Sequence, residues 1–422
     1  MQTELAPKFA GTSDGQTAQA ILNKCVHCGF CTATCPTYQL LGDELDGPRG
    51  RIYLIKQIAE GQTATEKTRL HLDRCLTCRN CESTCPSGVD YGHLIDIGRK
   101  WAEEQTKSRP LTERILRKLL INGLTNKPLF DHGMRLGRLL KPILPTALKN
   151  KIPAGKHPGK RPIQGKNTTK MLVLEGCVQP GMLPNINNAT IRVMNHLGVD
   201  VLSAPKAGCC GALKYHLNEQ AAGLDDMRRN IDAWWPYITG EAPECQGEKV
   251  QAILMNASGC GVTVKEYEHM LKDDLQYAEK AKVISALCKD LVEILPSYTS
   301  QLKTLLGPLN KKMVYHPPCT LQHGQKIKGV LEKFLGELGI QTLLCNDSHL
   351  CCGSAGTYSI LQPTLSKTLK EQKINNLLNT VNDSGAEKII SANIGCITQL
   401  QNNQAEVEHW IELIDASLVK NY

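Results

Sequence analysis

The sequence predicts an α/β multidomain protein in which an α-helical, cysteine-rich N-terminal domain precedes two copies of one α/β unit. At 422 residues the chain exceeds a single typical core and suits two or three domains. Its 19 cysteines form two groups, eight before residue 90 and eleven from residue 177 to residue 396. The second group repeats its own spacing. We therefore expect four segments, at 1–108, 109–168 (a helical connector and basic linker), 169–300 and 308–422.

Composition narrows the class of protein. Hydrophobic residues make up 41% and charged residues 21% of the chain, as in ordinary globular proteins. The N-terminus lacks a basic stretch followed by an apolar one, so we expect no secretory signal and a reducing, cytoplasmic compartment. Clustered cysteines there bind metal more often than they form disulfides. No apolar run reaches the roughly 18 residues of a membrane span, so any membrane contact would be peripheral.

The formal net charge of +8 is modest and partly local. Seven Lys or Arg residues, no acidic residue, three prolines and three glycines lie between Lys149 and Lys170. This composition favours an exposed linker, with a lipid-headgroup or partner contact as the alternative.

Two four-cysteine runs dominate the N-terminal segment. Each has the spacing C-x2-C-x2-C-x3-C-P, typical of two-cluster ferredoxins, in which the fourth cysteine ligates the other cluster. Zinc also binds CxxC pairs but would leave surplus thiolates here. The 39 residues between the runs contain a predicted helix at Gly50–Ile58 and a second before Cys75, which indicates a helical ferredoxin-like domain with two [4Fe–4S] clusters. The predicted ligands are Cys25, Cys28, Cys31 and Cys85 for the first cluster, and Cys75, Cys78, Cys81 and Cys35 for the second.

The connector, residues 111–148, has apolar positions at helical spacing, broken by Pro128, Pro142 and Pro145. Its mixture of Arg, Lys and Leu could lie on a membrane surface. We favour packing against the N-terminal domain.

The C-terminal half is a duplication. Three motifs of the first copy match three of the second: MLVLEGC matches MVYHPPC, AGCCG matches LCCG, and ASGCG matches NIGC. In both copies the cysteine pair begins 32 positions after the first cysteine. Short apolar runs that end in cysteine, separated by helix-length segments, predict α/β units whose strands deliver cysteines to one edge.

Four thiols per copy could bind a third [4Fe–4S] cluster or a zinc ion, or could simply be buried at a pseudo-symmetric interface. We expect metal at one of the two sets rather than at both. The favoured set is Cys319, Cys351, Cys352 and Cys396, and the less favoured set is Cys177, Cys209, Cys210 and Cys260. Nearby His316, His323 and His349 are expected to be hydrogen-bonded core or surface residues rather than ligands. The isolated Cys245, Cys288 and Cys345 are expected to be structural.

Two segments closely resemble the iron–sulfur subunit of bacterial glycolate oxidase. They are CVHCGFCTATCPTYQLLGDELDGPRGRIYLIK and LDRCLTCRNCESTCPSGVDYG. The resemblance continues through NIDAWWP, VKEY, CTLQH and DSHLCCGSAGTY. It implies an electron-transfer subunit on the cytoplasmic face of the inner membrane. FAD would lie on partner subunits that oxidise glycolate to glyoxylate, and quinone would be the acceptor. Partnership with a D-lactate or glycerol-3-phosphate dehydrogenase is the close alternative.

The duplicated half resembles the CCG cysteine-rich domain of heterodisulfide reductase subunits. That family ends its motif in CxxC, of which only Cys260 and Cys396 remain here. A thiol–disulfide reductase and a redox sensor are therefore weaker alternatives, and no helix-turn-helix pattern suggests a nucleic-acid partner. No GxGxxG, P-loop or HExxH motif occurs. We therefore expect no catalytic residues on this chain, with the substrate site on another subunit.

Overall fold

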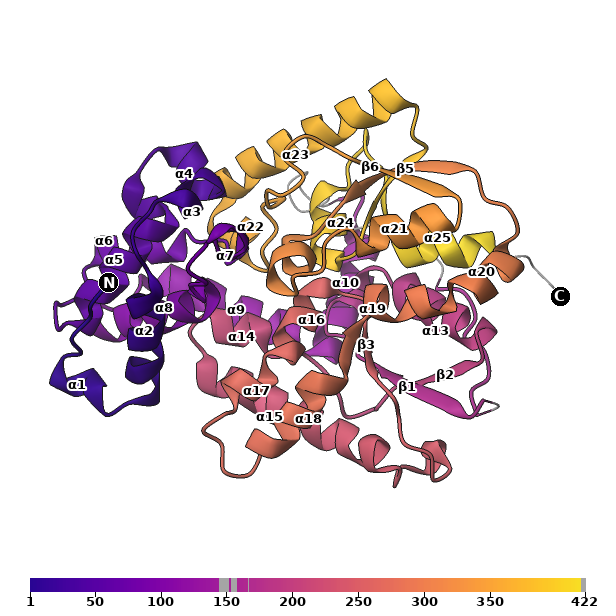
Figure 1. Ribbon diagram of the computed structural model, residues 1–422, viewed down its shortest axis with the longest axis horizontal. Helices are drawn as coiled ribbons and strands as arrows, with labels where there is room; N and C mark the ends of the chain where they lie inside the picture. The colour runs from indigo at the N-terminus through magenta and orange to yellow at the C-terminus, as the bar shows by residue number, and fades with distance from the viewer. Residues whose placement is uncertain (144–151, 153–157, 166, 419–422) are drawn as a thin grey trace.

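The computed structural model describes residues 1–143, 152, 158–165 and 167–418. A helical N-terminal domain lies beside two α/β units, and Figure 1 shows it at the left of the molecule, next to both of them. The described part of the chain therefore confirms the predicted fold class. The predicted linker, Lys149–Lys170, lies partly outside the described residues.

The N-terminal domain is built from short helices around a small apolar core. Thr12 caps one helix and Thr65 forms a capping box with Thr68 at another, satisfying backbone N–H groups that helix starts leave unpaired. Buried Leu22, Ile55 and Leu94 pack at the centre. The helices are α1 (Pro7–Ala10), α2 (Ser13–Lys24), α3 (Phe30–Ala33), α4 (Pro36–Leu41), α5 (Pro48–Ala59), α6 (Glu66–Asp73), α7 (Asn80–Thr84) and α8 (Tyr91–Gln105), with the 3₁₀ turn η1 (Glu44–Asp46).

The connector forms two helices, α9 (Leu111–Thr125) and α10 (Lys127–Leu140). The expectation that they pack on the N-terminal domain is met only at α9, where Arg117 pairs with Asp73 of α6 at 3.6 Å, and the main helix contacts of the pair lie elsewhere. α9 contacts α14 (Ala212–His216) and α10 contacts α12 (Gln179–Met182), both in the first α/β unit. Only Ile121 is buried in α9, and no residue is buried in α10. The apolar face of the pair therefore remains largely exposed.

Each α/β unit contains a four-stranded, all-parallel sheet. The strand orders are β2-β1-β3-β4 and β6-β5-β7-β8, so the two sheets have equivalent topology, as expected for a duplication. The strands are β1 (Thr169–Val173), β2 (Val199–Leu202), β3 (Ile253–Met255), β4 (Cys288–Asp290), β5 (Lys311–His316), β6 (Ile340–Leu344), β7 (Lys388–Ser391) and β8 (Val407–His409). The strands are largely buried, as is typical of parallel sheets covered by helices.

Helices join the two units through a shared core. Helix α13 (Asn185–His196) packs on α25 (Trp410–Ser417), and Arg192 pairs with Asp415 at 2.6 Å across that contact. One cluster of buried apolar residues includes Leu254 of the first sheet and Ile390 of the second. The other main helices are α15 (Gln220–Thr239), α16 (Ser258–Lys265), α17 (Tyr267–Met270), α18 (Ala278–Leu287), α21 (Val330–Glu337), α22 (Tyr358–Leu361), α23 (Pro363–Ser384) and α24 (Ile394–Leu400).

The central strands position the cysteines. β1 leads into Cys177 and β5 leads into Cys319, at the carboxyl edge where ligands bind in parallel sheets. None of the described helices is both long enough and apolar enough to span a bilayer.

Candidate metal centres

The two N-terminal cysteine loops have the same backbone shape. Left-handed residues follow each first cysteine by two and four positions, at His27 and Gly29 in the first loop and at Thr77 and Arg79 in the second. Left-handed backbone is costly for side chains other than glycine, so its repetition indicates that both loops are held in one required conformation. α3 and α7 start directly after these turns and carry the third cysteine of each run.

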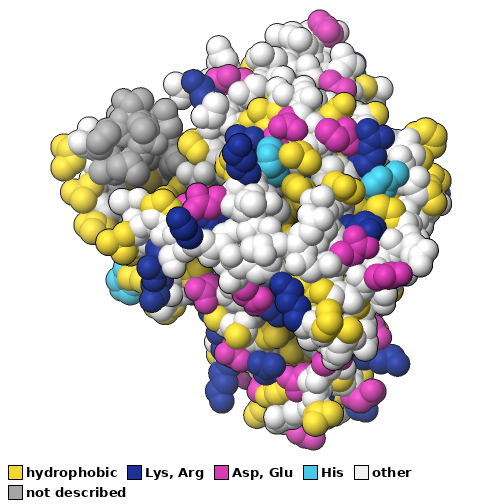
Figure 2. Space-filling model, turned by 90° about the vertical axis from the view of Figure 1, so that its left-hand side faces the viewer, with side chains coloured by type: hydrophobic (Ala, Val, Ile, Leu, Met, Phe, Trp, Pro, Cys, Tyr) yellow, Lys and Arg dark blue, Asp and Glu magenta, His cyan; other side chains and the backbone are white. Residues whose placement is uncertain are grey.

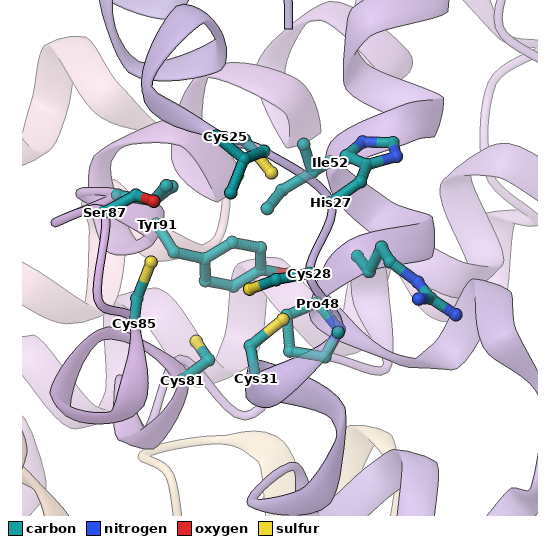
Figure 3. Close-up of a pocket in the computed structure, with 14 residues that line it drawn as sticks. Cys25, His27, Cys28, Cys31, Pro48, Ile52, Cys81, Cys85, Ser87 and Tyr91 are labelled. Carbon is teal, nitrogen blue, oxygen red and sulfur yellow. The ribbon is translucent and has the colours of Figure 1, made fainter.

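The first pocket collects cysteines from both runs. Cys25, Cys28 and Cys31 line it together with Cys85, which is 50 or more residues away in sequence, and Cys81 also lines it. Figure 3 shows these side chains around the pocket, with Tyr91 among them. The sequence-predicted first set is therefore brought together in space.

A second pocket adjoins the first. Cys35, Cys75, Cys78 and Cys81 line it, and Cys81, Pro48 and Tyr91 line both pockets. The predicted second set is also brought together, with Cys35 contributed by the first run. Each predicted set offers four thiols, the ligand number of a [4Fe–4S] cluster, so the donors fit that cofactor.

Burial disfavours the free thiolates in these pockets. Desolvation raises the pKa of Cys31 to about 11 and raises that of Cys78 well above its ordinary value. The positively charged iron of a cluster held by these cysteines would stabilise the deprotonated sulfurs.

The sequence reasoning missed several polar residues that surround the second pocket. Thr37 Oγ1 lies 3.3 Å from Cys35 Sγ, and the Tyr91 hydroxyl lies 3.7 Å from Cys75 Sγ. Buried Arg51 donates to Thr37 at 3.1 Å and pairs with Asp46 at 3.4 Å. Hydrogen bonds and charges around cluster sulfurs set the reduction potential, so these residues are positioned to tune it. No spacing signal in the sequence marks them.

The first α/β unit brings its four cysteines into one group, in which Cys209 and Cys210 are buried and Cys177 and Cys260 are partly buried. Contacts from Cys177 and Cys210 lower the pKa of Cys209, and contact with Cys209 raises the pKa of each of these two partners. Cys260 adds to the same group from α16.

The second unit gathers its four cysteines and a histidine. Cys319 Sγ lies 3.8 Å from Cys351 Sγ, and the Gly353 N–H donates to Cys351 Sγ at 3.4 Å. A ring nitrogen of His316 and the sulfurs of Cys352 and Cys396 lie within 4.8 Å of one another.

The three histidines predicted to be hydrogen-bonded behave differently. His323 Nδ1 lies 2.8 Å from Ser83 Oγ, and its Nε2 lies 2.9 Å from the carbonyl oxygen of His349, as expected. The prediction is wrong for His316, because neither of its ring nitrogens has a hydrogen-bond partner among the described residues. The buried Cys245, Cys288 and Cys345 lie apart from these sets, in agreement with a structural role.

The N-terminal domain is joined to both α/β units. Arg79, next to Cys78, pairs with Glu266 of the first unit, and His93 stacks on His269 of that unit with ring centroids 3.7 Å apart. On the other side, the Tyr358 hydroxyl donates to the Arg74 carbonyl at 3.0 Å. The outer face over this domain carries interspersed acidic and basic side chains rather than one sign of charge (Figure 2).

Comparisons with known proteins agree with this architecture. The family described as "4Fe-4S dicluster domain" matches residues 21–89, and the family described as "Cysteine-rich domain" matches residues 171–265 and 313–401. The chain is 50% identical to the glycolate oxidase iron-sulfur subunit of Escherichia coli (strain K12), over 100% of both chains.

Other relatives match the chain at lower identity. The chain is 30% identical to the probable glycolate oxidase iron-sulfur subunit of Bacillus subtilis (strain 168), covering 90% of this chain and 88% of that one. Lactate utilization protein A of Bacillus licheniformis is 24% identical over 57% of this chain and 96% of its own length. With full-length identity of this degree and both families of domain in place, the chain belongs to the family of glycolate oxidase iron–sulfur subunits.

Proposed function

We propose that this chain is the electron-transfer subunit of a glycolate-oxidising complex. It receives electrons from FAD-containing partner subunits that oxidise glycolate to glyoxylate and passes them towards quinone. The observation that carries the proposal is the pair of adjoining cysteine-lined pockets that share Cys81 and Tyr91. The choice of glycolate as substrate rests on the similarity to the E. coli glycolate oxidase iron-sulfur subunit.

The proposed ligands interleave the two runs. Cys25, Cys28, Cys31 and Cys85 hold one [4Fe–4S] cluster, and Cys75, Cys78, Cys81 and Cys35 hold the other. Each cluster, when bound, carries one electron at a time. The chain keeps the two positions adjacent and buries Cys35, Cys75 and Cys81 at the second. We also propose the domain boundaries 1–108, 109–168, 169–300 and 308–422.

The experiment is anaerobic co-purification of the chain with its partner subunits. We expect flavin on the partners, and glycolate should reduce clusters on this chain, detected by low-temperature EPR. Reduction by D-lactate but not by glycolate would show that D-lactate, and not glycolate, is the substrate of the complex. Absence of cluster reduction by any 2-hydroxy acid would overturn the electron-transfer role.

The connector helices support peripheral contact with an anionic membrane. Seven Lys or Arg residues and two acidic residues lie in 111–141, and basic charge beside an apolar face suits anionic lipid headgroups. The exposed apolar side chains of this surface are Leu111, Ile115, Leu116, Leu119, Leu129, Leu136, Leu139, Leu140 and Ile143. This location would place the complex beside a membrane-dissolved quinone.

Vesicle flotation tests the membrane contact. The complex should float with phosphatidylglycerol-containing vesicles and much less with phosphatidylcholine vesicles. L119E combined with L139E should abolish flotation. L275E is the matched control, because Leu275 is fully exposed outside the connector. Equal flotation of all variants, or none with anionic vesicles, would contradict the proposal.

A further inference from the structure

His316 is a buried histidine with unmet hydrogen-bonding capacity. It ends β5, three residues before Cys319, and only 1% of its surface is exposed. Neither Nδ1 nor Nε2 has a hydrogen-bond partner among the described residues. Buried polar atoms are nearly always paired, so an imidazole in this position needs another partner.

The candidate partner is a metal ion shared with two cysteines. Cys352 follows β6 and Cys396 lies in α24, so three separate parts of the second unit deliver one donor atom each to the same point. These three atoms lie within 4.8 Å of one another, and all three residues are buried. Imidazole nitrogen and thiolate sulfur are the donors that zinc prefers.

The first copy of the duplication provides an internal comparison. Both copies have 32 residues from the first cysteine to the pair, so Leu174 occupies the position that His316 occupies in the second copy. Leu174 is buried and packs in an apolar cluster. None of the comparably compact donor groups in the described residues comes from the first-copy cysteines. The imidazole and the compact donor group therefore occur together, in one copy.

The compactness indicates a single ion rather than a cluster. Tetrahedral zinc, with bonds of about 2.0–2.3 Å, holds its ligand atoms roughly 3.5–4 Å apart. Cubane ligands bind different irons and are held further apart, and no three of the N-terminal cysteine sulfurs appear among the compact groups of the described chain. The one other compact group, Asp43, Asp46 and His71, is already engaged, because Arg74 pairs with Asp46 at 2.8 Å.

We propose that His316, Cys352 and Cys396 bind one zinc ion, with Cys319 or Cys351 supplying the fourth ligand. The imidazole compensates for the cysteine missing from the CxxC of this copy. Because every ligand comes from the protein and the site is little exposed, it is closed, as structural zinc sites are, rather than catalytic. It would fasten the end of β5 to α24 beside the second N-terminal pocket.

Metal analysis of the intact complex tests the proposal. We expect about one zinc and about eight iron atoms per chain, from one ion and two four-iron clusters. Zinc K-edge absorption should show sulfur at about 2.3 Å and nitrogen at about 2.0–2.1 Å. Absence of zinc, a sulfur-only shell, or about twelve iron atoms would each overturn it, the last by placing a third cluster here.

Variants locate the ion. H316L, which installs the first-copy residue, should reduce zinc to less than about a fifth of the wild-type amount while iron stays near eight atoms. C345A is the matched control, because Cys345 is a buried cysteine of the same unit outside the donor group, and it should retain zinc. Full zinc retention in H316L would overturn the proposal. If H316L fails to fold, the absorption spectrum of the wild-type complex still decides the outcome.

Discussion

Cys78 of the N-terminal domain and Cys319 of the second α/β unit pack against the same small apolar cluster, formed by Leu76, Cys351, Tyr358 and Leu369. The two residues are 241 positions apart in the sequence. The second α/β unit therefore packs over Leu76 at the second N-terminal pocket, whereas Val26, at the equivalent loop position to Leu76 in the first run, is 67% exposed.

This difference predicts unequal responses to polar substitution. L76S should raise the reduction potential of the cluster held by Cys78, because a hydroxyl and added water near the sulfurs stabilise the more negative reduced state. V26S, the matched control, should change the other potential little, since that position already faces solvent. Redox titration followed by EPR measures both. Equal shifts in the two variants would refute the unequal burial argument.

Substitution of the fourth cysteines should have crossed effects. C35S should damage the cluster held by Cys75, Cys78 and Cys81, and C85S should damage the one held by Cys25, Cys28 and Cys31. Each variant should lose up to about four iron atoms and one of two EPR signals. If each substitution affected the signal of its own run instead, the interleaved ligand sets would be wrong. Assigning the signals requires C28S and C78S as references.

Asp290 should make stability depend on pH. Burial raises the pKa of this carboxyl from 3.8 to about 7, against the lowering effects of the Val292 N–H and Lys265. The folded state then binds the proton more tightly than the unfolded state, so its stability falls as pH rises from about 4 to about 7. D290N retains a side-chain oxygen to cap Val292 and should remove this dependence. The Tm difference, variant minus wild type, should grow from about pH 4 to about pH 7 and level off above that; a constant difference across this range would contradict the prediction.

Gly50 should not tolerate a side chain. A Cβ at this position would lie 2.1 Å from the Glu44 backbone oxygen, so η1 and α5 would have to separate. We expect G50A to destabilise the chain by about 1–3 kcal/mol and to lower iron content, because Pro48 of the same helix lines both pockets.

G123A is the matched control for G50A. Gly123 lies in α9, where an added Cβ meets nothing within 4 Å, and helix propensity favours alanine by about 1 kcal/mol. Thermal unfolding and iron analysis of both variants make the comparison. Equal Tm values for G50A and wild type would show that the close approach of η1 to α5 is not required.

The sequence by itself determined the fold class and the duplication, and it predicted the cysteine sets that the two pockets bring together. Ligand spacing within a loop and the repeated 32-residue interval are local properties of the chain, so they can be read without a structure. Helix positions in the connector could also be read, but not the surface they cover. The apolar pattern is the same whether a helix packs on one domain, on another, or remains exposed.

Only the tertiary structure decided which groups meet across the chain. His316 was expected to be an ordinary hydrogen-bonded residue, and its orphaned nitrogens beside Cys352 and Cys396 depend on how β5, α24 and the loop after β6 converge. The contact of Cys78 and Cys319 with one apolar cluster likewise depends on domain docking. Such contacts join residues far apart in sequence, and their geometry is fixed by packing of the whole core, which no local spacing encodes.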